Sequence, residues 1–540
     1  MRSFRRPRDF GAHGEPRERQ AQRADDVPAQ LAGGDDRSGM MTEGRSRRGI
    51  RARWLRVASA AVVLAGVVAA GVYLEQGSSH SPTSSPATVQ PATPGALGTQ
   101  PVAPHPPALP RPPQPAQLSQ PAQLPQPSQL PQPSQLVGTS QKICQLTGEM
   151  DRQSGAPVPT VNQTASRWGL VGTDNGYSFE YGGDLWFLFG NAVPTPSFLG
   201  RPNQTNIPVR QPGDSDAMGF SAVSAIGICP RLTFVPDGIG AFTRPTVITA
   251  PGQAPVTLRT NEVPEAGISE GGVMYVVFGT DNFASNPPGE PGRPAGGPTR
   301  SVMTVAVNGA EQLEFRYLYD LSTPPAGKFT FVAMAHAGDG YVYFWGDTAG
   351  GSSWRHSNPY FARKPVNTIG EPGGMQYFAG FDASGGPVFS SSEPNAVPLF
   401  SDTPDPCVGE LSVQWNEYLG RWIMLYNCAD DTPANPRGIY LRVATYPWGP
   451  WSAPTTVFAT QDGLCRFIHR AMTPTQPQCD NLSSAARLGV QGGDYSPGII
   501  DRFTTGGPAT AGSPAWTRIE YTMSTWNPYE IVVMATTVHD

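Results

Sequence analysis

Short aromatic and β-branched runs, separated by Gly, Pro, Asn and Asp, fill the chain from residue 141 onward. Each run is too short for a helix and nearly continuous in apolar character, which is typical of strands buried on both faces. Five runs resemble one another: Gly183–Gly190, Gly272–Gly279, Gly340–Gly346, Gly420–Tyr426 and Arg518–Ser524. Neighbouring strands are predicted at Ser301–Val307, Ile439–Thr445 and Tyr529–Thr536. No long stretch has a 3.6-residue period, so residues 141–540 are predicted to form an all-β domain.

Repetition of a central strand favours a β-propeller, because radially packed sheets bury both faces of their inner strands. Five repeats predict five blades. The alternative is a pair of β-sandwich domains, which the loose spacing of the repeats leaves open.

The first 74 residues follow a different pattern. Residues 57–74 are an uncharged apolar run, and the 14 Arg and 8 acidic residues of the tail before it, residues 1–56, give that tail a charge of +6. We predict a disordered cytoplasmic tail and a single-pass transmembrane helix with its N-terminus inside. The alternative is a cleaved secretory signal. Met40 and Met41 offer a second start, which would make residues 1–39 a wrongly assigned beginning.

Residues 75–140 are rich in Pro, Gln, Ser and Ala and repeat as PAQLSQ, PAQLPQ and PSQLPQ. Proline holds such a chain near polyproline II, and few apolar residues are present to build a core. This segment is therefore predicted to be a disordered linker. Whether it carries the domain out into a cell wall or is a tether of loosely constrained length stays open.

Charge and cysteine content bear on the compartment and the partners. The whole chain holds 38 basic and 43 acidic residues, so removing the tail leaves 24 basic and 35 acidic residues, a charge of −11 that argues against nucleic acid as a ligand.

Six cysteines after the apolar run fit an oxidising compartment. Six cysteines allow fifteen pairings, and spacing favours Cys407 with Cys428, Cys465 with Cys479, and Cys144 with Cys229. Sequons occur at Asn162, Asn203 and Asn481, a motif short enough to arise by chance.

The segment from Leu170 to Asn191, LVGTDNGYSFEYGGDLWFLFGN, sets an acidic Thr-Asp-Asn-Gly turn beside a dense aromatic strand. Gly176 is free to adopt positive φ there. A carboxylate at such a turn can point into a pocket, so we interpret the segment as one edge of a sugar-binding cleft, with Asp174 as its acid. The competing interpretation is that Asp174 caps the turn.

Three longer motifs resemble the actinobacterial family catalogued as domain of unknown function 4185: GTDNGYSFEYGGDLWFLFGN, GYVYFWGDTAGGSSWRHSNPYFARKP and YTMSTWNPYEIVVMATT. The resemblance covers most of residues 160–537. It implies a five-bladed propeller and an endo-D-arabinofuranosidase activity on the arabinan of cell-wall arabinogalactan or lipoarabinomannan. Such hydrolysis needs two carboxyl groups, one protonated and one ionised.

The resemblance also implies that Asp174 pairs with an acid in a Phe-Gly-Asp motif, where this chain has Asn191. An amide cannot titrate, so it cannot serve as acid, base or nucleophile. Either the chain only binds arabinan, or another acid substitutes, or position 191 is a substrate contact. Replacement acids are drawn from strand ends and glycine turns: Asp216, Glu265, Asp347 and Glu410. The competing interpretation makes Asp347 a turn residue and Glu410 a solvated loop acid.

Aromatic and polar residues in turn-rich stretches are the candidates for sugar contacts: Trp354, Arg355, Trp415, Asp494, Trp526 and Tyr529, together with Asn191. Asp494 is equally well explained as a turn residue. Trp186, Trp345 and Trp422 lie within the repeated strands and are predicted to be core.

The sequence offers little support for other catalytic chemistries. There is no HExxH or GxxxxGK[ST] pattern, and the histidines are scattered, so no metal site and no cofactor are predicted. Loops rich in Asp and Asn supply the oxygen ligands that calcium prefers, so a structural calcium ion is an open alternative. The function expected is thus a membrane-anchored, cell-wall-facing glycoside hydrolase. The alternatives are a non-catalytic arabinan-binding propeller and an envelope interaction scaffold, and the oligomeric state is not predicted.

Overall fold

The computed structural model describes residues 136–151, 153, 158–194, 215–221, 229–235, 247–258, 262–281, 298–307, 314–348, 357–401, 407–428, 436–470 and 491–540. The predicted tail, apolar run and most of the linker lie outside these ranges. Within them, no helix is both long and apolar enough to cross a membrane.

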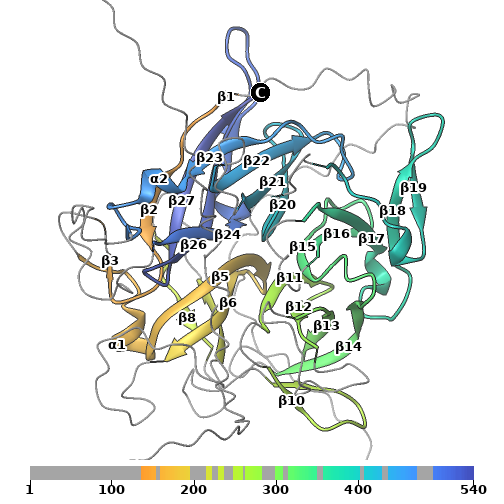
Figure 1. The fold of residues 1–540 in the computed structure, drawn as a ribbon, viewed down its shortest axis with the longest axis horizontal. Helices are drawn as coiled ribbons and strands as arrows, with labels where there is room; N and C mark the ends of the chain where they lie inside the picture. Colours follow the sequence, from red (N-terminus) through yellow and green to blue (C-terminus); the bar gives the residue numbers. More distant parts are fainter. Residues whose placement is uncertain are drawn as a thin grey trace, which may run out of the picture. The chain divides into compact units, whose positions relative to one another are not determined.

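The described residues form an all-β, propeller-like arrangement (Figure 1). The first sheet contains β5 (Leu170–Tyr181), β6 (Asp184–Pro194), β7 (Ser215–Ser221) and β8 (Thr233–Phe234), in that order. The second runs β11 (Pro264–Glu270), β12 (Val273–Gly279), β13 (Ser301–Ala306), β14 (Phe315–Ser322), β9 (Val247–Thr249) and β10 (Val256–Thr257). The third contains β15 (Phe331–Ala335), β16 (Tyr341–Asp347), β17 (Tyr360–Pro365), β18 (Gln376–Phe381) and β19 (Pro387–Ser390).

The fourth sheet contains β20 (Leu411–Asn416), β21 (Arg421–Cys428), β22 (Gly438–Ala444) and β23 (Thr455–Ala459). The fifth unites both ends of the domain: β24 (Gly493–Ile499), β26 (Trp516–Trp526), β27 (Glu530–His539), β1 (Leu136–Val137), β2 (Gln141–Gln145) and β25 (Thr505–Gly507). Smaller elements are β3 (Met150–Asp151), β4 (Val158–Pro159), α1 (Thr164–Trp168), α2 (Thr460–Gly463), η3 (Val366–Thr368), η4 (Glu393–Asn395) and η5 (Asp501–Phe503).

One edge strand of each sheet takes part in a closed ring of contacts. β5 contacts β11, β11 contacts β15, β15 contacts β20, β20 contacts β24, and β24 contacts β5 again. We call these five the inner strands. The five repeated apolar runs are β6, β12, β16, β21 and β26, each paired on both sides, and the other three predicted strands are β13, β22 and β27, so these predictions are confirmed.

Hydrophobic clusters fill the space between successive sheets because side chains alternate along each strand. On β6, Phe187 packs with residues of the fifth sheet, whereas Trp186 and Leu188 pack with residues of the second. On β16, Phe344 packs toward the second sheet and Trp345 toward the fourth. Burial on both faces explains why these runs are nearly continuous in apolar character. Trp186, Trp345 and Trp422 are all buried, as predicted.

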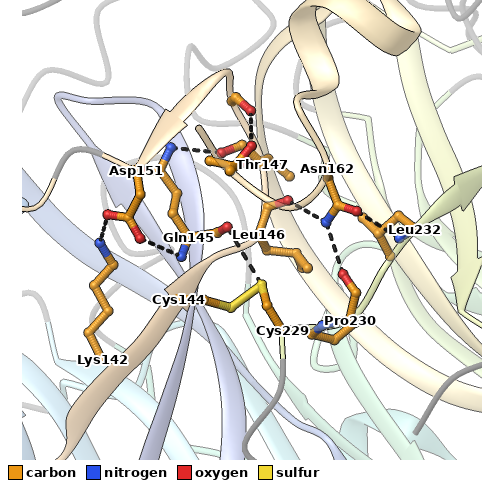
Figure 2. Close-up of a disulfide and its surroundings, with 12 residues drawn as sticks. Lys142, Cys144, Gln145, Leu146, Thr147, Asp151, Asn162, Cys229, Pro230 and Leu232 are labelled. Carbon is orange, nitrogen blue, oxygen red and sulfur yellow. Dashed lines mark hydrogen bonds and ion pairs between the residues drawn. A yellow bond between two sulfur atoms is a disulfide. The ribbon is translucent and has the colours of Figure 1, made fainter. Parts of the chain in front are cut away.

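The contact between the first and fifth sheets, which we call the seam, closes the ring. β5 contacts β24, β26 and β27, and a disulfide joins Cys144 on β2 to Cys229, which lies just before β8 (Figure 2). The predicted pairs Cys144–Cys229 and Cys407–Cys428 are confirmed. Cys465 is also disulfide-bonded, and its predicted partner Cys479 lies outside the described residues.

Asn162 supports the same disulfide region from within the protein (Figure 2). Its side-chain amide donates to the carbonyl oxygens of Leu146 and Pro230 and accepts from the Leu232 backbone N–H. The residue is fully buried. The Asn162 sequon therefore matches the glycosylation pattern by chance, because its amide nitrogen is already used in the core. The sequons at Asn203 and Asn481 lie outside the described residues.

Candidate functional site

Five buried carboxyl groups, one from each sheet, lie at or near the beginning of the inner strands. Their exposed fractions are 6% for Asp174, 2% for Glu265, 0% for Asp347, 4% for Glu410 and 6% for Asp494. Four belong to the inner strand or directly precede it, and Asp347 ends β16 opposite Phe331, the first residue of β15. Asp347, Glu410 and Asp494 are therefore neither exposed turn residues nor solvated loop acids, contrary to the competing interpretations.

Glycines on the second strands make room for two of these acids. Asp174 lies opposite Gly190 in the β5–β6 ladder, and a Cβ at position 190 would meet Asp174 Oδ1 at 2.9 Å. In the second sheet a Cβ at Gly279 would overlap Glu265 Oε1. The repeated Phe-Gly pairs thus have a physical cause, because the carboxyl group of the neighbouring inner strand occupies the place of the missing side chain.

Glu265, Asp347 and Glu410 form one electrostatic group. Burial raises the pKa of Glu265 well above its usual range, and the negative charges of Asp347 and Glu410 add to the shift. Burial, followed by the charge of Glu410, likewise raises the pKa of Asp347. Neither carboxyl oxygen of Asp347 has a hydrogen-bond partner among the described residues. A buried carboxyl in such surroundings favours its neutral, proton-bearing form.

The backbone around Asp174 is held in an unusual conformation. Asn175 has φ 68°, and Asn191 and Ser496, on β6 and β24, have φ 47° and 48°. Asparagine tolerates this left-handed region better than most residues, and strained residues concentrate at functional sites. The predicted turn at Thr173–Gly176 is in fact an irregular part of β5, where register shifts let the strand contain Asn175 and Gly176 at positive φ.

Neighbouring sheets fix this part of β5 through hydrogen bonds. Asn175 Nδ2 donates to the Pro264 carbonyl oxygen of the second sheet at 3.2 Å. From the fifth sheet, Ser524 Oγ donates to the Asn175 carbonyl oxygen at 3.3 Å and Thr522 Oγ1 to the Gly176 carbonyl oxygen at 2.8 Å. Asp174 is therefore held in place from both sides.

Tyr495 contacts Asp174 at the seam, where three predicted contact residues, Asn191, Trp526 and Tyr529, also lie. Tyr495 Oη donates to Asp174 Oδ2 at 3.2 Å, and Tyr529 Oη donates to the Asn191 carbonyl oxygen at 3.3 Å. Tyr495 and Tyr529 pack in one small cluster with the partly exposed Trp526, which meets Tyr529 edge to face at 5.9 Å between ring centroids. The seam therefore brings together an acid, an amide and an aromatic surface, as a sugar site needs.

Other predicted site residues lie elsewhere or outside the described residues. Trp415 lies five residues beyond Glu410, paired with Trp422, whose ring it meets edge to face at 5.6 Å. It is thus separated from the acid by roughly 16 Å of strand, and the structure does not bring it to the seam. Asp494, on β24 of the fifth sheet, accepts a hydrogen bond from Thr460, the first residue of α2. Asp216 lies on β7 without a described side chain, and Trp354 and Arg355 lie outside the described ranges.

No group of three or more His, Cys, Asp or Glu side chains in the described part of the chain is placed to hold a metal ion. The alternative of a structural calcium ion, left open by the sequence, is not tested by the structure.

Two tyrosines of the site have no counterpart among the predicted residues. Tyr495 follows Asp494 in the Gly-Gly-Asp-Tyr stretch, and Tyr177 follows the Asp174 segment. Burial raises the pKa of the Tyr177 phenol, and the charges of Glu410, Glu265 and Asp347 add to it. The signal available was their position, one residue after Asp494 for Tyr495 and three residues after Asp174 for Tyr177, but an aromatic residue in a strand usually indicates core.

Fold and site together define a propeller-like all-β protein with a group of buried carboxyls around its inner strands. The chain belongs to the family described as Domain of unknown function (DUF4185), whose model matches residues 160–535. No curated protein matches the sequence.

Similar solved structures include an alpha-L-arabinofuranosidase from Podospora anserina, at 12% identity and TM-score 0.32 over 74% of this chain and 99% of that one. A GH43_1 enzyme from Xanthomonas citri has 11% identity and TM-score 0.32 over 67% and 86%. An N-acetylgalactosamine deacetylase from F. plautii has 7% identity and TM-score 0.35 over 74% and 95%.

Proposed function

We propose that this protein is a glycoside hydrolase that cuts within D-arabinan by two-carboxylate chemistry. The observation that carries the proposal is the placement of Asp174, a buried carboxyl fixed from two neighbouring sheets, beside carboxyls whose surroundings keep them protonated. Hydrolysis of a glycosidic bond needs this contrast, because one carboxyl must give a proton while the other is ionised.

Glu265 is the proton donor in this proposal. Burial and the negative charges of Asp347 and Glu410 raise its pKa, which keeps the proton available near neutral pH. Its strand lies next to β5, and Asn175, adjacent to Asp174, donates to Pro264, adjacent to Glu265. Glu265 thus substitutes for the acid that Asn191 does not supply. Asn191 serves as a substrate contact, and the partly exposed Trp526, backed by the buried Tyr529, offers ring surface to a furanose.

The cellular setting is part of the same proposal. The domain faces the cell wall outside the cytoplasmic membrane, held by the helix at residues 57–74 and the linker at 75–140, with arabinogalactan or lipoarabinomannan as substrate. The five sheets are the blades of one five-bladed propeller. Two disulfides in the described residues support an oxidising compartment, and the ring of contacts among the inner strands supports the blade number.

Asn191 favours a second candidate, a propeller that binds arabinan without cutting it. Incubating the purified full-length chain with arabinogalactan separates the two functions. Release of oligosaccharides supports the hydrolase, whereas retention of the protein on the polysaccharide without release supports the binder. Asn191→Asp sharpens the comparison, because restoring the carboxyl should give a binder hydrolytic activity it lacked.

Single substitutions then test the two roles. Asp174→Asn and Glu265→Gln should each lower the rate of release by at least about 100-fold while preserving side-chain shape. Asp382→Asn is the matched control, because Asp382 lies in an exposed turn of the third sheet, where it accepts from the backbone of Ser384 and Gly386. Release that is unchanged in Asp174→Asn or Glu265→Gln would refute the role of that residue.

A further inference from the structure

The fifth sheet supplies a phenol directly to the acid of the first sheet. Tyr495 lies on β24, and its hydroxyl donates to Asp174 Oδ2 at 3.2 Å across the seam. Both side chains are buried, at 8% and 6% exposure. A buried hydrogen bond from a neutral donor to a charged acceptor is stronger than one between neutral groups.

Packing and a neighbouring hydrogen bond fix the position of the Tyr495 ring. The ring packs with Val193 and Tyr529 in the cluster that the first and fifth sheets share. The next residue, Ser496, has φ 48° and donates from its hydroxyl to Asn175 Oδ1 at 3.4 Å. Two successive residues of β24 therefore contact two successive residues of β5.

We propose that Tyr495 is a positioning residue that holds Asp174 in its ionised form, and that Asp174 is consequently the base or nucleophile of the pair. This inference rests on the proposed function and deepens it. A phenol that donates to a carboxyl stabilises the carboxylate, whereas a proton donor for the leaving group needs a neutral carboxyl. The assignment leaves the donor role to the neighbouring sheet, where Glu265 lies.

Other ionisable groups lie on the elements packed against β5. They are Arg167 on α1, Asp184 on β6, Glu265 and Glu270 on β11, Asp494 and Tyr495 on β24, Arg518, Glu520 and Tyr521 on β26, and Glu530 and His539 on β27, with Tyr529 just before β27. Acids predominate in this set. A hydrogen bond from a neutral donor opposes the repulsion between ionised acids of this set and an ionised Asp174.

The test removes only the hydroxyl, in Tyr495→Phe. In the full-length chain acting on arabinogalactan, the acid limb of the pH profile should move up by about 1 to 2 pH units, as expected for loss of a hydrogen bond to a charged group. Release at the alkaline side of that limb should recover. Tyr521→Phe is the control, because Tyr521 lies in the same sheet and its buried hydroxyl donates to Ser140 Oγ at 2.7 Å. An unmoved acid limb in Tyr495→Phe would overturn the proposal.

A second measurement is independent of activity. Melting temperatures of the wild type, Tyr495→Phe, Asp174→Asn and the double variant form a cycle that isolates the coupling between the two side chains. The coupling should be present near pH 7 and weaker near pH 3, because the carboxyl gains a proton as the pH falls. Coupling that is absent, or equal at both pH values, would refute the role of Tyr495 even if the chain is active. If the wild type releases nothing from arabinogalactan, the proposed function fails, and this cycle still decides whether Tyr495 holds an ionised Asp174.

Discussion

The disulfide between Cys144 and Cys229 joins the fifth sheet to the first, and removing it tests whether the seam closes the ring. The two cysteines are 85 residues apart in sequence. In the chain-entropy relation, a loop of that length restricts the unfolded chain by roughly 4.6 kcal/mol at 25 °C. Cys144→Ala combined with Cys229→Ala should therefore lower the free energy of unfolding by about that amount.

Cys407 and Cys428 provide the comparison, because their bridge joins the end of β21 to the segment just before β20 and does not cross the seam, and their separation is 21 residues. The same relation gives roughly 3.3 kcal/mol for the loss of that bridge. Urea denaturation of the full-length chain, followed by tryptophan fluorescence, measures both losses.

Activity on arabinogalactan distinguishes the two bridges further. The seam variant should also release less oligosaccharide at temperatures below its unfolding transition, because Tyr495 and Tyr529 reach the site across the loosened contact. The variant of the fourth sheet should keep its activity there. A seam variant that loses less than about 1 kcal/mol, or whose activity matches that of the Cys407 and Cys428 variant, would refute this account of ring closure.

Three further changes test the site and its support. Gly279→Ala places a Cβ where Glu265 Oε1 lies, so release should fall more than tenfold and stability by about 1–3 kcal/mol, whereas Gly138→Ala, with no atom nearer than 3.5 Å, should change neither. Burial raises the pKa of Asp347, so the folded protein holds a proton that the unfolded chain releases. The free energy of unfolding of the wild type should therefore fall as the pH rises above the ordinary carboxyl range. Urea denaturation at several pH values should show a shallower fall for Asp347→Asn. Asn162→Ala leaves two carbonyl oxygens and one N–H without their partner, so the melting temperature should drop by an amount equivalent to about 2–3 kcal/mol, and mass spectrometry of the wild type should find no glycan at this residue.

The strands next to the inner ones could be predicted from the sequence because burial on both faces makes them nearly continuous runs of apolar residues. Trp186 and Trp345 are core for that reason, and the pairing of Cys144 with Cys229 followed from the spacing of the other cysteines. The inner strands have a weaker apolar pattern. β5, β11 and β24 contain glycine and acids, and Thr173–Gly176 has the composition of a turn because Asn and Gly at positive φ serve turns and strand irregularities alike.

The contacts that assemble the site could not be predicted from local patterns. Tyr495 and Asp174 are 321 residues apart in sequence, yet they share a hydrogen bond. No periodicity within β5 or β24 indicates that these two strands are neighbours, because that depends on how the ring closes. Individual acids such as Glu265 and Asp347 could be named from their place beside strands. Their electrostatic grouping required the three-dimensional arrangement.

The seam also sets when the site can exist. Asp174 belongs to one of the earliest strands of the domain, and Tyr495 and Tyr529 are among its last fifty residues. A chain emerging from the ribosome or crossing a membrane carries the acid long before it carries the side chains that orient it. The proposed activity on polysaccharide therefore requires the complete domain, and a chain cut short at its C-terminus would contain Asp174 without an assembled site.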